Sequence, residues 1–269
     1  MKKYVISVLL VAVLSGSSRV AVADSDDAWH EGPAGRQRKL HLVITLSVGA
    51  AYLTTAVLFH DALAPDQCRW CEPPSIDVKA RNALVWDRAD RARTTSDILG
   101  AFAIPTLSVV VPNLLLIGSD PGFGDVLDVT LPIAETVLAT QILTYFAKSA
   151  IGRQRPYAHF GSARPSADTT EDNVSHWSGH TSLSFALATS AGMVARMRNM
   201  KAEPAIWAVG MTLAASTGYL RIAGDMHYLT DVLVGAAVGL GAGFTIPRLI
   251  DQNLAITTSG KTVMLVGQF

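Results

Sequence analysis

The chain has 269 residues, of which 49% are hydrophobic and 16% charged, and its net charge at pH 7 is zero. Average soluble proteins carry about 25% charged residues, and the mean hydropathy of +0.31 is high for a soluble globule but low for a chain that consists almost wholly of membrane spans. The zero net charge excludes a general attraction to nucleic acid, so we predict no nucleic-acid partner, and any anion site must arise from local clusters of cations.

The first residues have the pattern of a bacterial export signal. Lys2 and Lys3 form a basic start, Tyr4–Leu14 is apolar, and Ala21–Asp24 contains an A-x-A site with cleavage after Ala23. The apolar run is short for a span of roughly 20 residues, and an uncleaved signal anchor is the alternative. We therefore expect a protein of the bacterial envelope.

The next apolar stretch, Leu42–Phe59, is uncharged and long enough to cross a bilayer. The polar segment that follows, Asp61–Asp97, mixes Arg with Asp and contains the two cysteines of the chain, Cys68 and Cys71. Two thiols without a group of histidines do not indicate zinc, and the context of a thioredoxin motif is missing. We expect either a local disulfide or free thiols.

Five further apolar stretches are each predicted to form a helix: Ile98–Gly118, Val126–Ala147, Thr181–Ala195, Ala205–Leu220 and Tyr228–Ile246. Gly235, Gly239 and Gly243 recur at every fourth residue and share one helix face, which indicates close helix packing. The sequence therefore predicts an all-α fold, a bundle of about six apolar helices in a multi-pass membrane protein.

The predicted organisation has four parts. A signal peptide (1–23) precedes a first apolar helix with the polar Cys-containing loop (24–97), and a helical core (98–246) precedes a C-terminal tail (247–269). The end of the tail has the composition of a short β-type or frayed terminus.

A first polar cluster follows the stretch Val126–Ala147. Lys148, Arg153, Arg155 and Arg164 occur there in a segment without any acidic residue. Arginine binds phosphate oxygens through paired N–H groups, and lysine adds a point charge. The cluster therefore predicts an anion site, in which we interpret Arg153 as an ordinary loop charge.

A second cluster opens the helix Thr181–Ala195. The first N–H groups of a helix have no intrahelical partner and lie at the positive end of its dipole, which favours an anion. Ser178 and Gly179 suit such a turn, and His180 projects from the first turn, whereas we interpret His176 as an ordinary loop residue.

A third cluster lies between the last two helices and contains Arg221, His227 and Asp231. His227 and Asp231 are four residues apart and share a helix face, and a carboxylate beside an imidazole fixes its tautomer. We interpret Asp225 as a helix-end charge. In an up-and-down bundle the three clusters fall at the same end, where they could stabilise a phosphoryl group without a metal, with histidines as nucleophile and acid/base.

Together the clusters resemble the type 2 phosphatidic acid phosphatase family, which includes bacterial class A acid phosphatases and shares its fold with vanadium haloperoxidases. The family pattern is K-x6-RP, PSGH and SR-x5-H-x3-D. Lys148–Pro156 matches the first block, the second has Trp177 in place of proline, and the third has Leu220 in place of serine. The resemblance covers roughly Ile98–Ile246. Because proline fixes φ, Trp177 leaves the conformation of the preceding loop open.

The resemblance implies a role for each residue that matches the pattern. His227 is the nucleophile, Asp231 orients it, and His180 is the acid and base. The phosphate-binding residues are Lys148, Arg155, Ser178, Gly179 and Arg221. No metal or other cofactor is implied.

We therefore expect a metal-independent phosphatase that hydrolyses a phosphomonoester or pyrophosphate, of a lipid because apolar helices surround the clusters, through a phosphohistidine. The alternatives are a soluble periplasmic acid phosphatase or phosphotransferase, a vanadate haloperoxidase and a non-catalytic membrane protein. The expected location is the bacterial inner membrane. Three spans after a cleaved signal would place the site on the cytoplasmic side, whereas membrane members of the family usually face outward.

Overall fold

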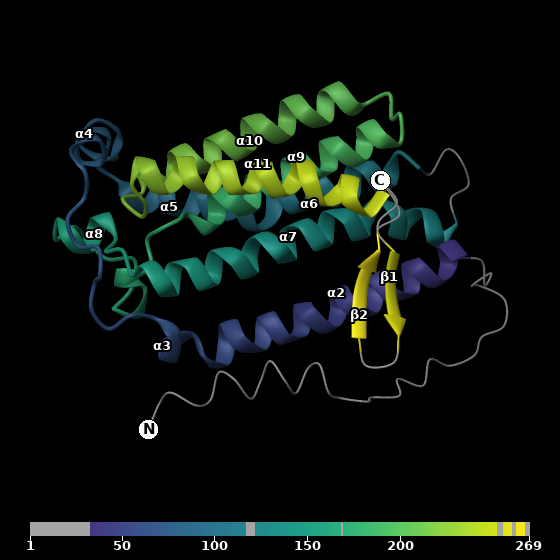
Figure 1. Cartoon of the computed structure of the whole chain (residues 1–269). Helices are drawn as coiled ribbons and strands as arrows, with labels where there is room; N and C mark the ends of the chain where they lie inside the picture. The colour runs from purple at the N-terminus through teal and green to yellow at the C-terminus, as the bar shows by residue number, and fades with distance from the viewer. Residues whose placement is uncertain (1–32, 117–121, 168, 252–254, 260–261, 267–269) are drawn as a thin grey trace.

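The computed structural model describes residues 33–116, 122–167, 169–251, 255–259 and 262–266. Six long helical segments run side by side in it (Figure 1). Five are single helices: α2 (Pro33–Leu58), α7 (Phe123–Ile151), α9 (Gly179–Met197), α10 (Glu203–Ala223) and α11 (Leu229–Asp251). The sixth consists of α5 (Ala89–Ile98), the π-helical turn η1 (Leu99–Ala103) and α6 (Ile104–Leu114). The predicted signal peptide lies outside the described residues.

Short elements complete the chain. They are α3 (His60–Leu63), α4 (Ser75–Leu84), α8 (Pro156–His159), the 3-10 turn η3 (Thr170–Asn173) and the strands β1 (Ala255–Ser259) and β2 (Thr262–Val266). The strands form an antiparallel hairpin in which Ala255 lies opposite Val266, so the tail has the β-type end that was one of its two expected forms. The predicted helical bundle is confirmed. Its helices extend beyond the apolar stretches because polar residues continue their ends: α2 begins at Pro33 and not at Leu42.

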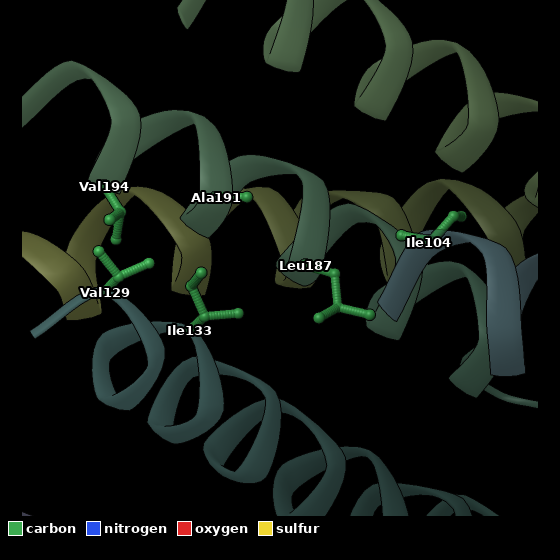
Figure 2. Close-up of a cluster of buried hydrophobic side chains, with 6 residues drawn as sticks. All are labelled: Ile104, Val129, Ile133, Leu187, Ala191 and Val194. Atoms are coloured by element: carbon green, nitrogen blue, oxygen red, sulfur yellow. The ribbon is translucent and has the colours of Figure 1, made fainter. Parts of the chain in front are cut away.

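Helix α9 lies at the centre of the bundle and packs against α6, α7, α10 and α11. Figure 2 shows part of this core, where Ile104 of α6, Val129 and Ile133 of α7 and Leu187 of α9 meet. All four side chains are buried. Helix α2 stands at the edge and packs mainly on α7 (Figure 1). The core therefore fixes the ends of α7 and α9 relative to each other.

The predicted packing role of the glycine face on α11 is confirmed. A Cβ atom on Gly235 would lie 2.7 Å from the backbone oxygen of Ser178, and one on Gly243 would lie 2.5 Å from Cβ of Thr189. A side chain at these positions would therefore collide with α9. The glycines let the backbone of α11 approach α9, which brings the first turn of α11 beside Ser178.

Four helical segments are long and apolar enough to cross a membrane: Gly35–Leu58, Ala89–Leu114, Phe123–Ile151 and Leu229–Ile250. Large apolar side chains on their outer faces are exposed, including Leu46, Val57, Phe102 and Leu233. Apolar faces of this extent suit hydrocarbon better than water. The prediction of a multi-pass membrane protein is thereby supported over a soluble one.

Candidate active site

The three polar clusters meet at the end of the bundle where α7 and α10 end and α9 and α11 begin, which is the left end in Figure 1. Lys148 lies in the last turn of α7, which ends at Gly152 with a left-handed φ of 62°. Arg221 lies in the last turn of α10, and His227 precedes α11. Ser178 caps α9. The up-and-down order of the helices thus gathers residues that are far apart in the sequence.

Ser178 and Gly179 place the N-terminus of α9 against the end of α7. The Ser178 hydroxyl accepts a hydrogen bond from the backbone N–H of Thr181 at 3.4 Å. The backbone N–H of Ser178 donates to the backbone oxygen of Asp231 at 3.1 Å. A Cβ atom on Gly179 would lie 3.6 Å from Nζ of Lys148. The ammonium group and the positive end of the α9 dipole therefore face the same space, which suits an anion.

His227 is 2% exposed and lies at the centre of the site. Its Nε2 is 3.3 Å from an Nη atom of Arg155, and its Nδ1 faces the Asp231 carboxylate at 3.8 Å and the Ser175 hydroxyl at 3.5 Å. Burial lowers the pKa of His227 well below 6.5, the nearby Asp231 carboxylate raises it, and the cations Arg155 and Lys148 lower it. The imidazole is thus neutral at neutral pH, and Nε2 carries a lone pair.

Arg155 is buried, and its backbone and side chain are both held by the turn η3. Its backbone N–H donates to the backbone oxygen of Asp172 at 2.7 Å, and its Nε donates to the backbone oxygen of Glu171 at 2.7 Å. Its guanidinium also pairs with the side-chain carboxylate of Glu171. Burial raises the pKa of Glu171, but Arg155, Lys148 and His60 together lower it to about 2. The sequence analysis missed Glu171 because no motif marks this loop.

Asp97 of α5 is a second residue that the sequence analysis missed. Its Oδ1 lies 3.2 Å from Nε2 of His180 and 2.7 Å from Nη1 of Arg221. Arg221 also donates to the Ser96 hydroxyl at 3.1 Å. Gly100 in η1 allows this approach, because a Cβ atom there would lie 3.1 Å from the His180 ring. Asp97 therefore connects the predicted acid/base with a predicted phosphate ligand.

The interpretation of Arg153 as an ordinary loop charge and of His176 as an ordinary loop residue was wrong. Asp225 does follow the end of α10, as expected, but it is buried. Arg153 is 1% exposed and donates to Oδ1 of Asp231 at 2.5 Å, and Nδ1 of His176 lies 2.8 Å from the same oxygen. Asp225 has φ of 58° and accepts two hydrogen bonds from Arg81, at 2.7 and 2.8 Å. Their partners lie in other elements, so local sequence context does not indicate their burial.

The two departures from the family pattern are accommodated by packing. The Trp177 indole N–H donates to the hydroxyl of Thr144 at 2.8 Å, which fastens the loop before α9 to α7. Leu220 is buried in an apolar cluster with Ala92 and Ala223. The substitutions therefore exchange the proline and the serine for contacts that still hold the loop and the helix end.

The donors in this site suit an anion. Within the described ranges, no three His, Cys, Asp or Glu side chains are grouped so that they could hold a metal ion. Three cations, Lys148, Arg155 and Arg221, each act electrostatically on the imidazole of His227. Such a set of ammonium and guanidinium donors fits the oxygens of a tetrahedral phosphate.

Two known proteins are similar to this chain. Over 84 residues the chain is 42% identical to a lipid A 1-phosphatase of Porphyromonas gingivalis, an alignment that spans 31% of this chain but only 17% of that protein. A crystal structure described as the first transmembrane PAP2 type phosphatidylglycerolphosphate phosphatase, from Bacillus subtilis, is 18% identical, with a TM-score of 0.49 and coverage of 81% of this chain and 97% of that one.

The family model described as the PAP2 superfamily matches residues 130–255. This range contains the three motif blocks at 148–156, 177–180 and 220–231. Over this range, slightly less than half of its length, the chain is similar to the PAP2 superfamily.

Proposed function

We propose that the chain is a phosphatase that hydrolyses a phosphate ester or pyrophosphate of a lipid at the membrane surface. The observation that carries this proposal is the neutral, buried His227 imidazole, whose Nε2 lies 3.3 Å from Arg155 and close to Lys148 and Arg221. A nucleophile surrounded by cations is what attack on an anionic phosphorus atom requires, because the cations offset the repulsion and stabilise the charge that develops.

In the first step Nε2 of His227 attacks phosphorus, and the bond between phosphorus and the leaving oxygen breaks. His180 donates a proton to that oxygen, so the alcohol or phosphate leaves in a protonated form. Asp231 and Ser175 lie on the Nδ1 side, where they favour the tautomer with a free lone pair on Nε2. Hydrogen bonds of this kind are often long before substrate binds.

In the second step His180 takes a proton from water as the water oxygen attacks phosphorus. The bond between Nε2 and phosphorus breaks, phosphate leaves, and His227 returns to its neutral state. The cradle of Lys148, Arg155, Arg221 and the N-terminus of α9 holds the phosphoryl oxygens through both steps.

A lipid substrate is favoured by the surroundings of the site. Each of the four candidate spans has one end at this end of the bundle, and their outer faces carry exposed apolar side chains (Figure 1). The relative that is 42% identical over 84 residues is a lipid A 1-phosphatase. A phosphate held at the end of these helices lies at the depth of lipid headgroups.

We further propose that the site faces the periplasm. The Cys68–Cys71 disulfide lies at the active-site end, and disulfides persist in oxidising compartments. At the opposite end, the last turn of α9 and the loop before α10 carry Arg196, Arg198 and Lys201, a concentration of cations that is typical of cytoplasmic ends. This orientation places the start of α2 in the cytoplasm, which is incompatible with cleavage after Ala23.

Labelling in intact cells tests the orientation. A membrane-impermeant maleimide is expected to label Asp87→Cys, at the active-site end, and to leave Lys201→Cys unlabelled until the cells are lysed. The opposite labelling pattern would place the site in the cytoplasm. N-terminal sequencing of the mature chain tests cleavage after Ala23 separately.

The function is tested by phosphate release from detergent-purified protein in EDTA, on phosphatidic acid, phosphatidylglycerophosphate, a polyprenyl pyrophosphate and p-nitrophenyl phosphate. We expect turnover of a lipid that vanadate inhibits, that His227→Ala abolishes and that the control His159→Ala keeps. Persistence of turnover in His227→Ala would refute the mechanism. Turnover of p-nitrophenyl phosphate alone would favour a broad acid phosphatase, and halide oxidation with peroxide and vanadate would favour a haloperoxidase.

A further inference from the structure

The disulfide loop between α3 and α4 lies against the segment that carries the phosphate-binding arginine. Cys68 and Cys71 form a disulfide, which was one of the two expected outcomes, the other being free thiols. The backbone N–H of Trp70 donates to the Gly152 oxygen at 3.3 Å, and the Trp70 oxygen accepts from the N–H of Gln154 at 3.1 Å. This short ladder fixes the loop to the chain immediately after α7.

The side chain of Trp70 covers the buried guanidinium of Arg153. The centre of this guanidinium lies 4.0 Å from the Trp70 ring and 4.3 Å from the Tyr228 ring. Its nitrogens donate to Asp231 at 2.5 Å and to Asp77 at 2.6 Å. Two aromatic faces and two carboxylates thus fix the plane of this arginine, and cation–π contacts of this kind are strongest where water is excluded.

Trp70 also contacts the other donor to the same carboxylate oxygen. Its ring centroid lies 5.5 Å from that of His176, whose Nδ1 is 2.8 Å from Oδ1 of Asp231. Oδ2 of Asp231 faces the opposite way, toward the Ser175 hydroxyl at 2.6 Å and toward Nδ1 of His227. The two donors beside Trp70 therefore hold Oδ1, while the Ser175 hydroxyl and the backbone N–H of Tyr228, at 3.0 Å, hold Oδ2. The plane of the carboxylate is fixed by both pairs of donors together.

We infer that Trp70 is a positioning residue: it keeps Arg153 and His176 on Oδ1 of Asp231, and so keeps Oδ2 directed at His227. This inference rests on the proposed function, in which His227 reacts through Nε2. Without the ring, water reaches the guanidinium, the carboxylate turns more freely, and His227 populates both neutral tautomers. Within the part of the chain that the structure describes, the Trp70 side chain contacts Arg153, His176 and the backbone of Glu72, and not the cations of the phosphate cradle.

The test compares Trp70→Ala, Trp70→Phe and the control Trp86→Ala, whose exposed ring meets Tyr219 edge to face and donates to its hydroxyl. Trp70→Ala is expected to lower kcat about fivefold, in proportion to the smaller fraction of His227 whose Nε2 carries a lone pair, with KM and vanadate inhibition within about threefold of wild type. Trp70→Phe keeps an aromatic face and should recover most of kcat. Trp86→Ala should behave as wild type.

A second readout needs no turnover. Nitrogen NMR of the imidazole, assigned with His227→Ala, is expected to show one neutral tautomer, protonated at Nδ1, in wild type and a mixture of both in Trp70→Ala. An unchanged tautomer with unchanged kcat in folded Trp70→Ala would overturn the inference, and so would an equal loss of kcat in Trp70→Phe. If wild type turns over no substrate, the proposed function fails and the tautomer alone decides the role of Trp70.

Discussion

Replacement of Asp97 by asparagine tests whether this carboxylate supports His180 as the acid. Asp97 lies 3.2 Å from Nε2 of His180 and 2.7 Å from Nη1 of Arg221. A carboxylate beside an imidazole favours its protonated form. The variant keeps the shape of the side chain and one oxygen for Arg221, so it removes mainly the negative charge.

The size of the effect follows from the distance and the exposure. Two unit charges 4 Å apart interact by about 1 kcal/mol in water and about 4 kcal/mol at an effective dielectric constant of 20. Because the Asp97 side chain is 56% exposed, the value near the aqueous limit applies, and salt screens it further. A loss of about 1.4 kcal/mol in the transition state corresponds to a tenfold fall in kcat.

The assay compares two substrates that differ in the leaving group. An alkyl phosphate such as phosphatidic acid needs a proton on its leaving oxygen, whereas p-nitrophenolate leaves without one. We expect kcat to fall about tenfold on phosphatidic acid and much less on p-nitrophenyl phosphate. Vanadate should bind equally or more tightly, since an anion has been removed from an anion site. The control is Asp90→Asn, an exposed position on the same helix. Equal losses on both substrates, or none on either, would refute the role assigned to Asp97.

Three other changes have defined outcomes. Because the pKa of His227 lies well below 6.5 and its neutral form reacts, kcat/KM should persist as the pH falls through 6.5 and be lost only at lower pH; an acid limb at 6.5 or above would contradict this. Glu171→Gln frees Arg155 from a competing carboxylate, so the inhibition constant of vanadate should fall by about threefold or more, and a rise would count against the cradle. Gly235→Ala sets a Cβ atom 2.7 Å from a backbone oxygen and should cost about 1–3 kcal/mol in thermal unfolding, while Gly241→Ala, with open space around it, should not.

The elements that could be predicted from the sequence are those with a local pattern. Each apolar stretch forms a long helix, and the four-residue period of Gly235, Gly239 and Gly243 predicts the face of α11 that packs on α9. The spacing of His227 and Asp231 likewise places both on one side of the site. These features depend on the spacing of residues that are close together in the sequence, so the period of a helix is enough to predict them.

The residues that the sequence analysis missed contact the site through partners far along the chain. Asp97 and Arg221 are 124 positions apart, and Arg153 and Asp231 are 78 apart. No local spacing encodes such pairs, because they arise only when the core sets the ends of α5, α7, α10 and α11 side by side. The burial of Arg153 follows from two carboxylates and two aromatic rings that come from three separate segments.

Trapping the covalent intermediate tests the central claim most directly. Wild type, His180→Ala and His227→Ala would be mixed with p-nitrophenyl phosphate labelled in its phosphoryl group, because its leaving group departs without a proton from His180. The reactions would be quenched in base within one turnover and analysed by peptide mass spectrometry. We predict a phosphohistidine at His227 in wild type, more of it in His180→Ala because hydrolysis of the intermediate then lacks its base, and none in His227→Ala. Turnover without any labelled histidine, or a label that persists in His227→Ala, would contradict the account.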